Sequence, residues 1–386
     1  MKNFIAQTIQ DLPPSGIRRF FDVASDMQGV VSLGVGEPDF ETPRHIREQA
    51  VLSLERQGTM YTSNAGMPDL KEEICRYMSA RYGLGYSPCE QVLVTVGASE
   101  GIDVALRAVV NPGDEVLVIE PCYVSYKPCV LMVGGVPVVI RTSAENGFCV
   151  TAADIEARIT PKTKAILISY PNNPTGATLA REDVESLAGL LRERDIIVIS
   201  DEVYAELTYG ESSHVSIASM PGMYSKTIVL NGFSKTFAMT GWRLGYACGP
   251  EDLIAAMTKI HQYVLMCAPT TAQYGGIEAL RNGEQSVLSM RKEYDARRRF
   301  MLNELWDMGI DCFEARGAFY LFPSISQFGL TSEEFCSRLL RERHLAVVPG
   351  TAFGDCGEGH IRCSYAYSVD IIKEALSRMR EFIKGL

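Results

Sequence analysis

The chain contains 386 residues, of which 46% are hydrophobic and 22% are charged. These proportions are ordinary for globular proteins and exclude a disordered or fibrous chain. The 37 basic and 47 acidic side chains give a formal net charge of −10. This balance argues against a nucleic-acid partner, because binding nucleic acid requires clustered positive charge. At roughly 150 residues per domain, the length predicts about two domains.

Signals for membranes, export and metals are weak. The first residues carry no apolar run long enough for a signal peptide. The longest weakly polar stretch, 130–140, is far shorter than the roughly 20 residues of a membrane-spanning helix. The eleven cysteines form no C-x-x-C pair, and no two of the five histidines share an i, i+4 helix face. We therefore expect a cytoplasmic protein with reduced thiols, no membrane segment and no metal site.

Short apolar runs alternate with helical patterns along the middle of the chain. The runs predict buried strands at 91–96, 115–119, 165–168, 196–199 and 227–230. Continuous β-branched runs separated by helices are typical of a mostly parallel sheet that helices flank on both faces. The predicted fold class is therefore α/β.

The last third of the chain has a different pattern. A long charged helical region is predicted over 278–308, followed by short strands around 318–322 and 361–365 and a final helix over about 371–383. We expect a large domain over 45–277 and a second, smaller α+β domain formed by 1–44 and 278–386. Within the charged helical region, the basic run 297–299 is expected to be a solvated helix face.

Polar residues follow several of the predicted strands. Ligands of open α/β sheets bind outside the carboxyl ends of the strands, so we expect these residues to converge on one crevice. The segments are Gly97-Ala98-Ser99, Pro121-Cys122-Tyr123, Asn173-Pro174-Thr175-Gly176, Asp201-Glu202-Val203-Tyr204 and Ser234-Lys235. A lysine held just past a buried strand can have its pKa lowered by desolvation, which favours a nucleophilic amine.

Each of these residues also has a structural explanation. Asn173-Pro174-Thr175-Gly176 is a good turn, Asp201 could cap a helix, and Lys235 could be an ordinary surface lysine.

The segment Gly97-Ala98-Ser99-Glu100-Gly101 fits two different hypotheses. It matches the G-x-S-x-G pattern of α/β-hydrolases, which would make Ser99 the nucleophile of a serine hydrolase. The same strand-to-helix turn could instead bind phosphate, because backbone N–H groups and the helix dipole favour anions there. Together with an amine, a carboxylate and an aromatic platform, a phosphate-binding turn meets the requirements of pyridoxal phosphate chemistry.

Three segments carry a resemblance to a known family. They are Leu33-Gly34-Val35-Gly36-Glu37-Pro38-Asp39-Phe40, Tyr61-Thr62-Ser63-Asn64-Ala65-Gly66 and Ser234-Lys235-Thr236-Phe237-Ala238-Met239-Thr240-Gly241-Trp242-Arg243-Leu244-Gly245. The chain resembles a class I aminotransferase of the pyridoxal-phosphate-dependent fold type I, of the aspartate or aromatic aminotransferase kind, along nearly its whole length. The last segment resembles the cofactor-lysine signature and is long and highly specific.

The resemblance implies roles around the cofactor ring. Lys235 would hold pyridoxal 5′-phosphate as a Schiff base and move the proton at the substrate's α-carbon. Asp201 would pair with the pyridine nitrogen. Tyr204 and Asn173 would hydrogen-bond the ring hydroxyl oxygen, and Tyr123 would stack on the ring face.

The resemblance also implies phosphate and substrate contacts. Ala98, Ser99, Ser234 and Arg243 would bind the cofactor around its phosphate, and Tyr61 would reach the phosphate of the partner subunit in a homodimer with shared active sites. Arg362 would grip the substrate α-carboxylate, with Gly34 closing over it and Tyr123 and Asn173 beside it. Two positions depart from the family pattern. Gly232 stands where many relatives carry Ser, and Ser99 stands where aspartate-specific relatives tend to carry Lys.

The sequence therefore predicts an aminotransferase that moves an amino group from an amino acid to a 2-oxo acid in ping-pong half-reactions. Neutral or aromatic substrates are expected, because a second cation for a dicarboxylate is missing at Ser99 and the segment 263–269 is mostly apolar. That segment would line the side-chain pocket or belong to the core. The alternatives are a pyridoxal-phosphate-dependent carbon–sulfur β-lyase and, from another class, the serine hydrolase.

Overall fold

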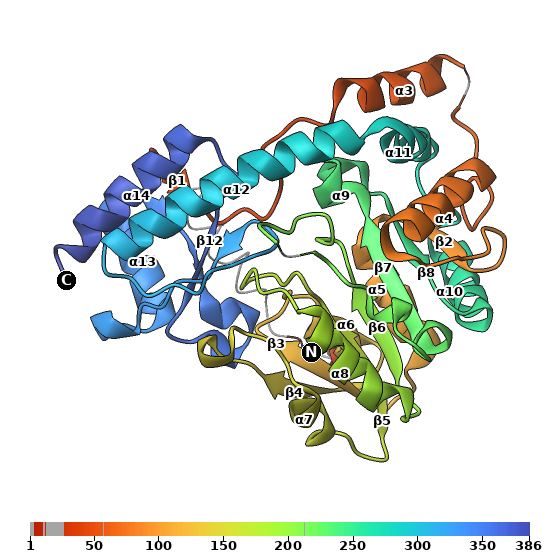
Figure 1. The fold of residues 1–386 in the computed structure, drawn as a ribbon, viewed down its shortest axis with the longest axis horizontal. Coiled ribbons are helices and arrows are strands. Elements are labelled where there is room, and N and C mark those ends of the chain that lie inside the picture. Colours follow the sequence, from red (N-terminus) through yellow and green to blue (C-terminus); the bar gives the residue numbers. More distant parts are fainter. Residues whose placement is uncertain (1–3, 11, 13–26, 57, 212) are drawn as a thin grey trace.

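A seven-stranded sheet forms the centre of the molecule in the computed structural model, which describes residues 4–10, 12, 27–56, 58–211 and 213–386. The strand order is β2-β8-β7-β6-β5-β3-β4 (Figure 1). The bounds are β2 Val92–Thr95, β3 Glu115–Glu120, β4 Val136–Arg141, β5 Thr163–Ile168, β6 Ile197–Asp201, β7 Thr227–Gly232 and β8 Gly245–Cys248. Only β8 runs antiparallel to its neighbours, β2 and β7. The five strands predicted from apolar runs are confirmed, and β4 and β8 are additional.

Alternate residues of the central strands enter different hydrophobic clusters, which shows that both faces of the sheet are covered. Leu117 of β3 and Ile166 of β5 pack with α8 (Arg181–Arg192), whereas their neighbours Val118 and Leu167 pack with helices of the opposite face. Those helices are α5 (Gly97–Val109), α6 (Tyr126–Met132) and α10 (Glu251–Val264). A strand buried on both faces needs apolar side chains at successive positions, which explains the continuous β-branched runs.

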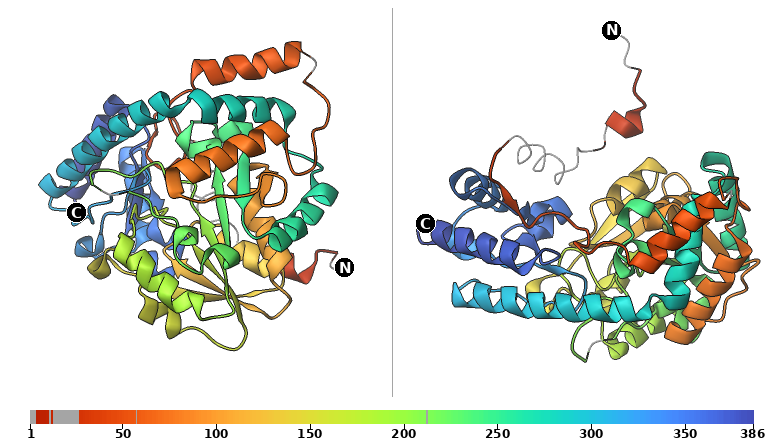
Figure 2. Two further views of the ribbon diagram at one scale, coloured as in Figure 1. Left: turned by 45° about the vertical axis from the view of Figure 1, so that its right-hand side comes forward. Right: turned by 90° about the horizontal axis from the view of Figure 1, so that it is seen from above.

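Further helices cover the end of the sheet that contains β2 and β8. They are α3 (Arg44–Glu55), α4 (Pro68–Tyr82) and α11 (Thr270–Asn282). Helices α3 and α11 pack along each other, as the left view of Figure 2 shows. The predicted helix over 278–308 is in fact the end of α11 followed by α12 (Glu284–Asp307). Gly283 separates the two, and a Cβ there would lie 2.7 Å from the ring of Phe237.

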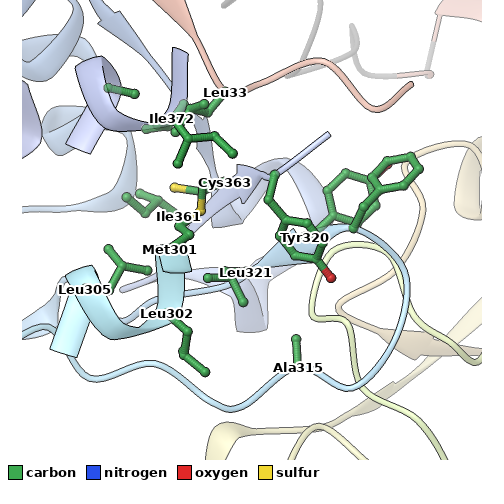
Figure 3. Close-up of a cluster of buried hydrophobic side chains, with 14 of the residues drawn as sticks. Leu33, Met301, Leu302, Leu305, Ala315, Tyr320, Leu321, Ile361, Cys363 and Ile372 are labelled. Carbon is green, nitrogen blue, oxygen red and sulfur yellow. The ribbon is translucent and has the colours of Figure 1, made fainter. Parts of the chain in front are cut away.

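Two small sheets lie near the C-terminal end of α12 (Figure 1). Strand β1 (Val31–Ser32) pairs with β10 (Leu345–Ala346), and β12 (Ile361–Ser364) lies between β11 (Val348–Pro349) and β9 (Tyr320–Leu321). Helices α13 (Ser332–Arg343) and α14 (Val369–Ile383) pack on them. The described residues also form the short α-helices α1 (Gln7–Gln10), α7 (Ala152–Glu156) and α9 (Phe233–Thr236). Figure 3 shows part of this second core, with Leu33, Met301 and Cys363 in one cluster.

The division into two domains stays a proposal. The central sheet falls within 45–277, and every small-sheet strand falls within 1–44 or 278–386. Among the residues that the structure describes, the N-terminal segment pairs with the C-terminal part of the chain through β1 and β10.

The basic run on α12 is not a solvated face. The Arg297 and Arg298 side chains are only 7% and 6% exposed, whereas Arg299 remains exposed. Arg297 Nη1 donates to both carboxylate oxygens of Asp39, at 2.8 and 2.9 Å. Arg298 donates to Asp295 and to the carbonyl of Ala315. The prediction was wrong because Asp39, from a distant segment, pairs with Arg297, and because Asp295 of the same helix and the carbonyl of Ala315 bind the buried Arg298.

Candidate active site

A cavity of about 500 Å³ opens at the carboxyl edge of the central sheet. Every predicted site residue except Tyr61 lines it: Gly34, Ala98, Ser99, Tyr123, Asn173, Asp201, Tyr204, Ser234, Lys235, Arg243 and Arg362. Most of them follow β2, β3, β5, β6 and β7, which all point in one direction. Their carboxyl ends therefore meet at one edge, as the sequence predicted. Gly34, which follows β1, and Arg362 of β12 come instead from the segments that form the small sheets.

Lys235 lies on the short helix α9, directly after β7. Its Nζ donates a hydrogen bond to the carbonyl of Gly36 at 2.6 Å. Burial lowers the pKa of this amine to about 8, with Glu37 opposing and the cations Arg362 and Arg243 adding to the shift. A substantial fraction of the amine is therefore uncharged near neutral pH, which makes it a nucleophile.

Asp201 is a buried carboxylate at the end of β6. Its Oδ2 accepts a hydrogen bond from the Tyr126 hydroxyl at 2.8 Å, and its Oδ1 accepts one from the backbone N–H of Val203 at 3.2 Å. Burial raises the pKa of this carboxyl group, and the two hydrogen bonds oppose the rise. A carboxylate in this environment is suited to pair with a positively charged group of a ligand that binds in the cavity.

Arg362 of β12 is 3% exposed and lies between two aromatic rings. Its guanidinium carbon is 4.4 Å from the ring centroid of Tyr320 and 4.7 Å from that of Phe353. Nη1 donates to Asn173 Oδ1 at 2.9 Å and Nη2 donates to the carbonyl of Gly34 at 2.5 Å. Its Nε has no hydrogen-bond partner among the described residues. This cation is fixed in place and has no carboxylate partner among the described residues, which suits it to bind an incoming carboxylate.

Tyr204 and Tyr320 form a second pair across the cavity wall. Their hydroxyl groups are 2.8 Å apart, and both rings are buried. Tyr204 follows β6, and Tyr320 belongs to β9. The pair therefore joins the edge of the central sheet to the three-stranded sheet.

The helix α5 begins at Gly97, against the cavity. Gly97 has a φ of +78°, and a Cβ at this position would lie 2.7 Å from Arg243 Nη2. Only glycine lets the guanidinium approach the amide groups of this turn so closely. Arg243 is exposed at the cavity rim, with no carboxylate partner in the part of the chain that the structure describes. The turn and the cation together form a cradle suited to a phosphate group.

Tyr61 lies apart from the cavity, with a side chain that is 79% exposed. The segment 263–269 does not line the cavity either, and Tyr263 to Met266 are exposed, so they are not core. Asn64 Nδ2 donates to the carbonyl of Met266 at 2.7 Å, and Thr270 Oγ1 donates to that of Met60 at 2.7 Å. We call the patch formed by Met60, Tyr61 and Tyr263 to Met266 the apolar surface.

The hydrolase hypothesis lacks a catalytic histidine. All five histidines lie in described parts of the chain, and none lines the cavity that contains Ser99. His45, His214 and His261 pair with Glu278, Glu202 and Glu100, and His360 stacks on Phe322. Ser99 therefore lacks the histidine base that a Ser-His-Asp triad requires.

Two cavity residues were missed by the sequence analysis. Tyr126 binds Asp201, and Tyr320 supports both Arg362 and Tyr204. Tyr126 lies three residues after Tyr123, on the first turn of a helix, and this spacing was a usable signal. Nothing local marks Tyr320, because its partners come from distant segments.

The described residues contain no group of three or more histidine, cysteine, aspartate or glutamate side chains that could hold a metal ion. Within the same residues, no helix has both the length and the apolar character needed to cross a membrane.

Comparisons with known proteins point to one family. A family model described as aminotransferase class I and II matches residues 28–379. The chain is 52% identical over 383 residues to a Bacillus subtilis protein named YugH, with 99% of each chain covered. It is 44% identical over 373 residues to an aspartate aminotransferase of Pyrococcus abyssi, with 96% of each covered. The crystal structure of an aromatic aminotransferase from Pyrococcus horikoshii superposes with a TM-score of 0.91 at 42% identity, covering 95% of this chain and 99% of the other.

Proposed function

Because the chain belongs to the class I and II aminotransferases and is a pyridoxal-phosphate-dependent enzyme of fold type I, we propose that the cavity at the carboxyl edge of its central sheet is the active site. There the protein moves an amino group from an amino acid to a 2-oxo acid in two half-reactions. The observation that carries this assignment is the convergence of Lys235, Asp201 and Arg362 on one cavity. The family supports neither the hydrolase nor the lyase alternative.

The cavity residues fit pyridoxal phosphate on observations that do not depend on the family. The Gly97 turn leaves room for the Arg243 guanidinium beside backbone amides, which suits a phosphate. Asp201 offers a buried carboxylate to a protonated ring nitrogen, and Tyr123 offers an aromatic face. When bound, pyridoxal phosphate supplies an aldehyde that condenses with amines and a ring that withdraws electrons from the substrate.

Lys235 is the residue that would attach the cofactor and later carry the proton at the substrate's α-carbon. Its low pKa supports both tasks, because an uncharged amine can attack a carbonyl and can accept a proton. Asp201 would keep the ring nitrogen protonated, and Tyr126 would hold this carboxylate in place.

Arg362 would bind the α-carboxylate that all amino acid substrates share. Asn173 and the Gly34 carbonyl fix two of its nitrogens, and Tyr320 supports the plane of the guanidinium. A fixed guanidinium orients a carboxylate and, through it, the α-carbon next to Lys235. Asn173, Tyr123 and Tyr204 would contact the cofactor ring, and Ala98, Ser99, Ser234 and Arg243 its phosphate.

A homodimer with shared active sites is part of the proposal. The apolar surface exposes Met60 at 76%, Tyr61 at 79%, Tyr263 at 84% and Val264 at 68%. Exposed apolar patches of this kind mark surfaces that other molecules cover. A second copy would bury the patch, and Tyr61 would then reach the phosphate site of the neighbouring subunit.

Neutral or aromatic amino acids are the proposed substrates. The cationic side chains that line the cavity are Lys235, Arg243 and Arg362, and each already has a role. A second substrate carboxylate would find no further cation among the described residues that line the cavity and would lose its hydration. Val35, Ile102 and Tyr320 add apolar and aromatic lining. A cytoplasmic location is proposed as well, supported by eleven cysteines that are all free thiols.

The deciding experiment is spectroscopic. Purified protein mixed with pyridoxal phosphate should develop a visible absorption band, which an amino acid shifts and a 2-oxo acid restores. Absence of the band would refute the proposed site. Turnover that continues without a 2-oxo acid, with release of ammonia, would instead indicate a lyase.

A further inference from the structure

A buried histidine–glutamate pair lies next to the first turn of α5, where Gly97, Ala98 and Ser99 form what we call the phosphate-binding turn. Glu100, in the first turn of α5, accepts a hydrogen bond from the backbone N–H of Val96 with Oε2. Its Oε1 lies 2.5 Å from Nδ1 of His261, on the last turn of α10. The His261 side chain is 0% exposed and that of Glu100 is 9% exposed. The transfer chemistry proposed above uses neither residue.

The contacts of His261 determine which nitrogen carries the proton. Its Nε2 is buried and has no hydrogen-bond partner among the described residues. A buried N–H without an acceptor is costlier than a bare ring nitrogen, so the proton belongs on Nδ1. His261 therefore donates to Glu100 and fixes its carboxylate.

The direction of this carboxylate matters for an anionic ligand. Ala98 and Ser99 line the cavity, whereas Glu100 does not, although it belongs to the same helical turn. Released from His261, a carboxylate at this turn would stand among the amide groups that attract a phosphate and would repel it. When His261 and Val96 hold it, the Glu100 carboxylate instead stabilises the turn from the side that faces away from the cavity.

The backbone of His261 contacts the apolar surface. The His261 carbonyl accepts hydrogen bonds from the N–H groups of Leu265 at 2.9 Å and Met266 at 3.2 Å, where α10 ends. Met266 has a φ of +70°, and its carbonyl accepts from Asn64. One residue thus contacts the phosphate-binding turn with its side chain and the proposed dimer surface with its backbone.

We infer that His261 is a positioning residue for phosphate binding: it holds the Glu100 carboxylate away from the cavity, so that the first turn of α5 presents its amide groups to the phosphate of the cofactor. This inference rests on the proposed function, since it concerns the same cavity. It adds a residue that touches neither cofactor nor substrate.

The test compares pyridoxal phosphate with pyridoxal, which lacks the phosphate, by absorbance titration of the cofactor-free protein. His261→Leu should raise the dissociation constant for pyridoxal phosphate about tenfold or more, while that for pyridoxal changes less than about twofold. His261→Asn places an amide N–H near the Nδ1 position and should bind pyridoxal phosphate within about threefold of wild type. Adding Glu100→Gln to His261→Leu removes the repelling charge and should restore most of the lost affinity.

Three results would overturn the inference: equal weakening of both ligands, unchanged phosphate binding in His261→Leu, or an Asn variant as weak as the Leu variant. If His261→Leu does not fold by circular dichroism, His261→Gln replaces it, because its amide group lies near the Nε2 position and leaves Glu100 without the hydrogen bond that Nδ1 provides. The ratio of pyridoxal phosphate to pyridoxal affinity should then fall in the Gln variant and stay near wild type in the Asn variant. Failure of the wild-type protein to bind pyridoxal phosphate would refute the proposed function, so the two failures are distinguishable.

Discussion

Arg362 Nη1 donates a hydrogen bond of 2.9 Å to Asn173 Oδ1, although the two residues are 189 positions apart. Asn173 follows β5 of the central sheet, and Arg362 belongs to the small three-stranded sheet. The hydrogen bond therefore joins the central sheet to the three-stranded sheet at the cavity. Arg362 has no carboxylate partner in the described ranges of the chain, so a substrate carboxylate would neutralise its charge.

Lys235→Ala should abolish covalent attachment of pyridoxal phosphate, because no other amine is placed among the cavity residues. Borohydride reduction followed by peptide mass spectrometry measures this directly. In the wild type, the pKa of about 8 predicts that the attachment rate rises with pH, is half-maximal near pH 8 and levels off above about pH 9, since the uncharged amine reacts. The exposed Lys384 is the matched control, and Lys384→Ala should label like wild type. Labelling of another lysine at full yield in Lys235→Ala would disprove the assignment.

Asp201→Asn should still bind cofactor but slow removal of the α-proton by about 100-fold or more, because the amide cannot stabilise a protonated ring nitrogen. Exchange of the α-hydrogen of an amino acid in deuterated water, followed by NMR, reports this step. Tyr126→Phe removes one hydrogen bond to the same carboxylate and should give a smaller effect. An unchanged exchange rate in Asp201→Asn would contradict the role.

Tyr61→Ala and Lys235→Ala subunits should complement each other if active sites are shared. Each variant alone should be nearly inactive, and mixed dimers should contain one site with both residues intact. Mixing under conditions that exchange subunits should recover up to about one quarter of wild-type activity, the share that random pairing gives. A fully active monomer in analytical ultracentrifugation would rule out this arrangement.

Phenylalanine, tyrosine, leucine or methionine should give a kcat/KM at least about tenfold higher than aspartate under one 2-oxo acid acceptor, because no further cation lines the cavity of this chain. Ser99→Lys supplies a cation at the cavity wall and should raise activity toward aspartate relative to phenylalanine. A wild-type enzyme that prefers aspartate would show that the second carboxylate finds a cation outside this chain's own cavity residues.

Arg297→Ala should lower the free energy of unfolding by about 2–4 kcal/mol, because it leaves the Asp39 carboxylate without its partner in a partly buried site. Arg299→Ala, two positions along the same helix but 64% exposed, should change it by about 0.5 kcal/mol or less. Chemical denaturation of both variants compares them. Similar losses would mean that burial of Arg297 contributes little.

The sequence by itself determined five of the seven strands of the central sheet and the polar residues that follow them. Apolar runs such as Val116 to Ile119 report burial on both faces, and polar residues at their ends then share one edge by the geometry of parallel strands. The lysine signature identified the family because it is long and its residues are contiguous. The helix boundary at Gly283 was not predicted, and neither were β4 and β8. Strand β4 contains Pro137, and β8 has four residues like β2 but contains no β-branched residue.

Only the tertiary structure decided which partners these residues have. Tyr126 meets Asp201 across 75 positions, Tyr320 meets Tyr204 across 116, and His261 meets Glu100 across 161. Arg297 is buried although a charged residue is expected at the surface, and Tyr263 to Met266 are exposed although apolar residues are expected in a core or a pocket. Local periodicity reports whether a side chain can face a core, whereas the identity of its neighbour depends on how distant elements pack. For this protein that packing determines which charges are paired, which lysine is desolvated and which apolar side chains stay exposed.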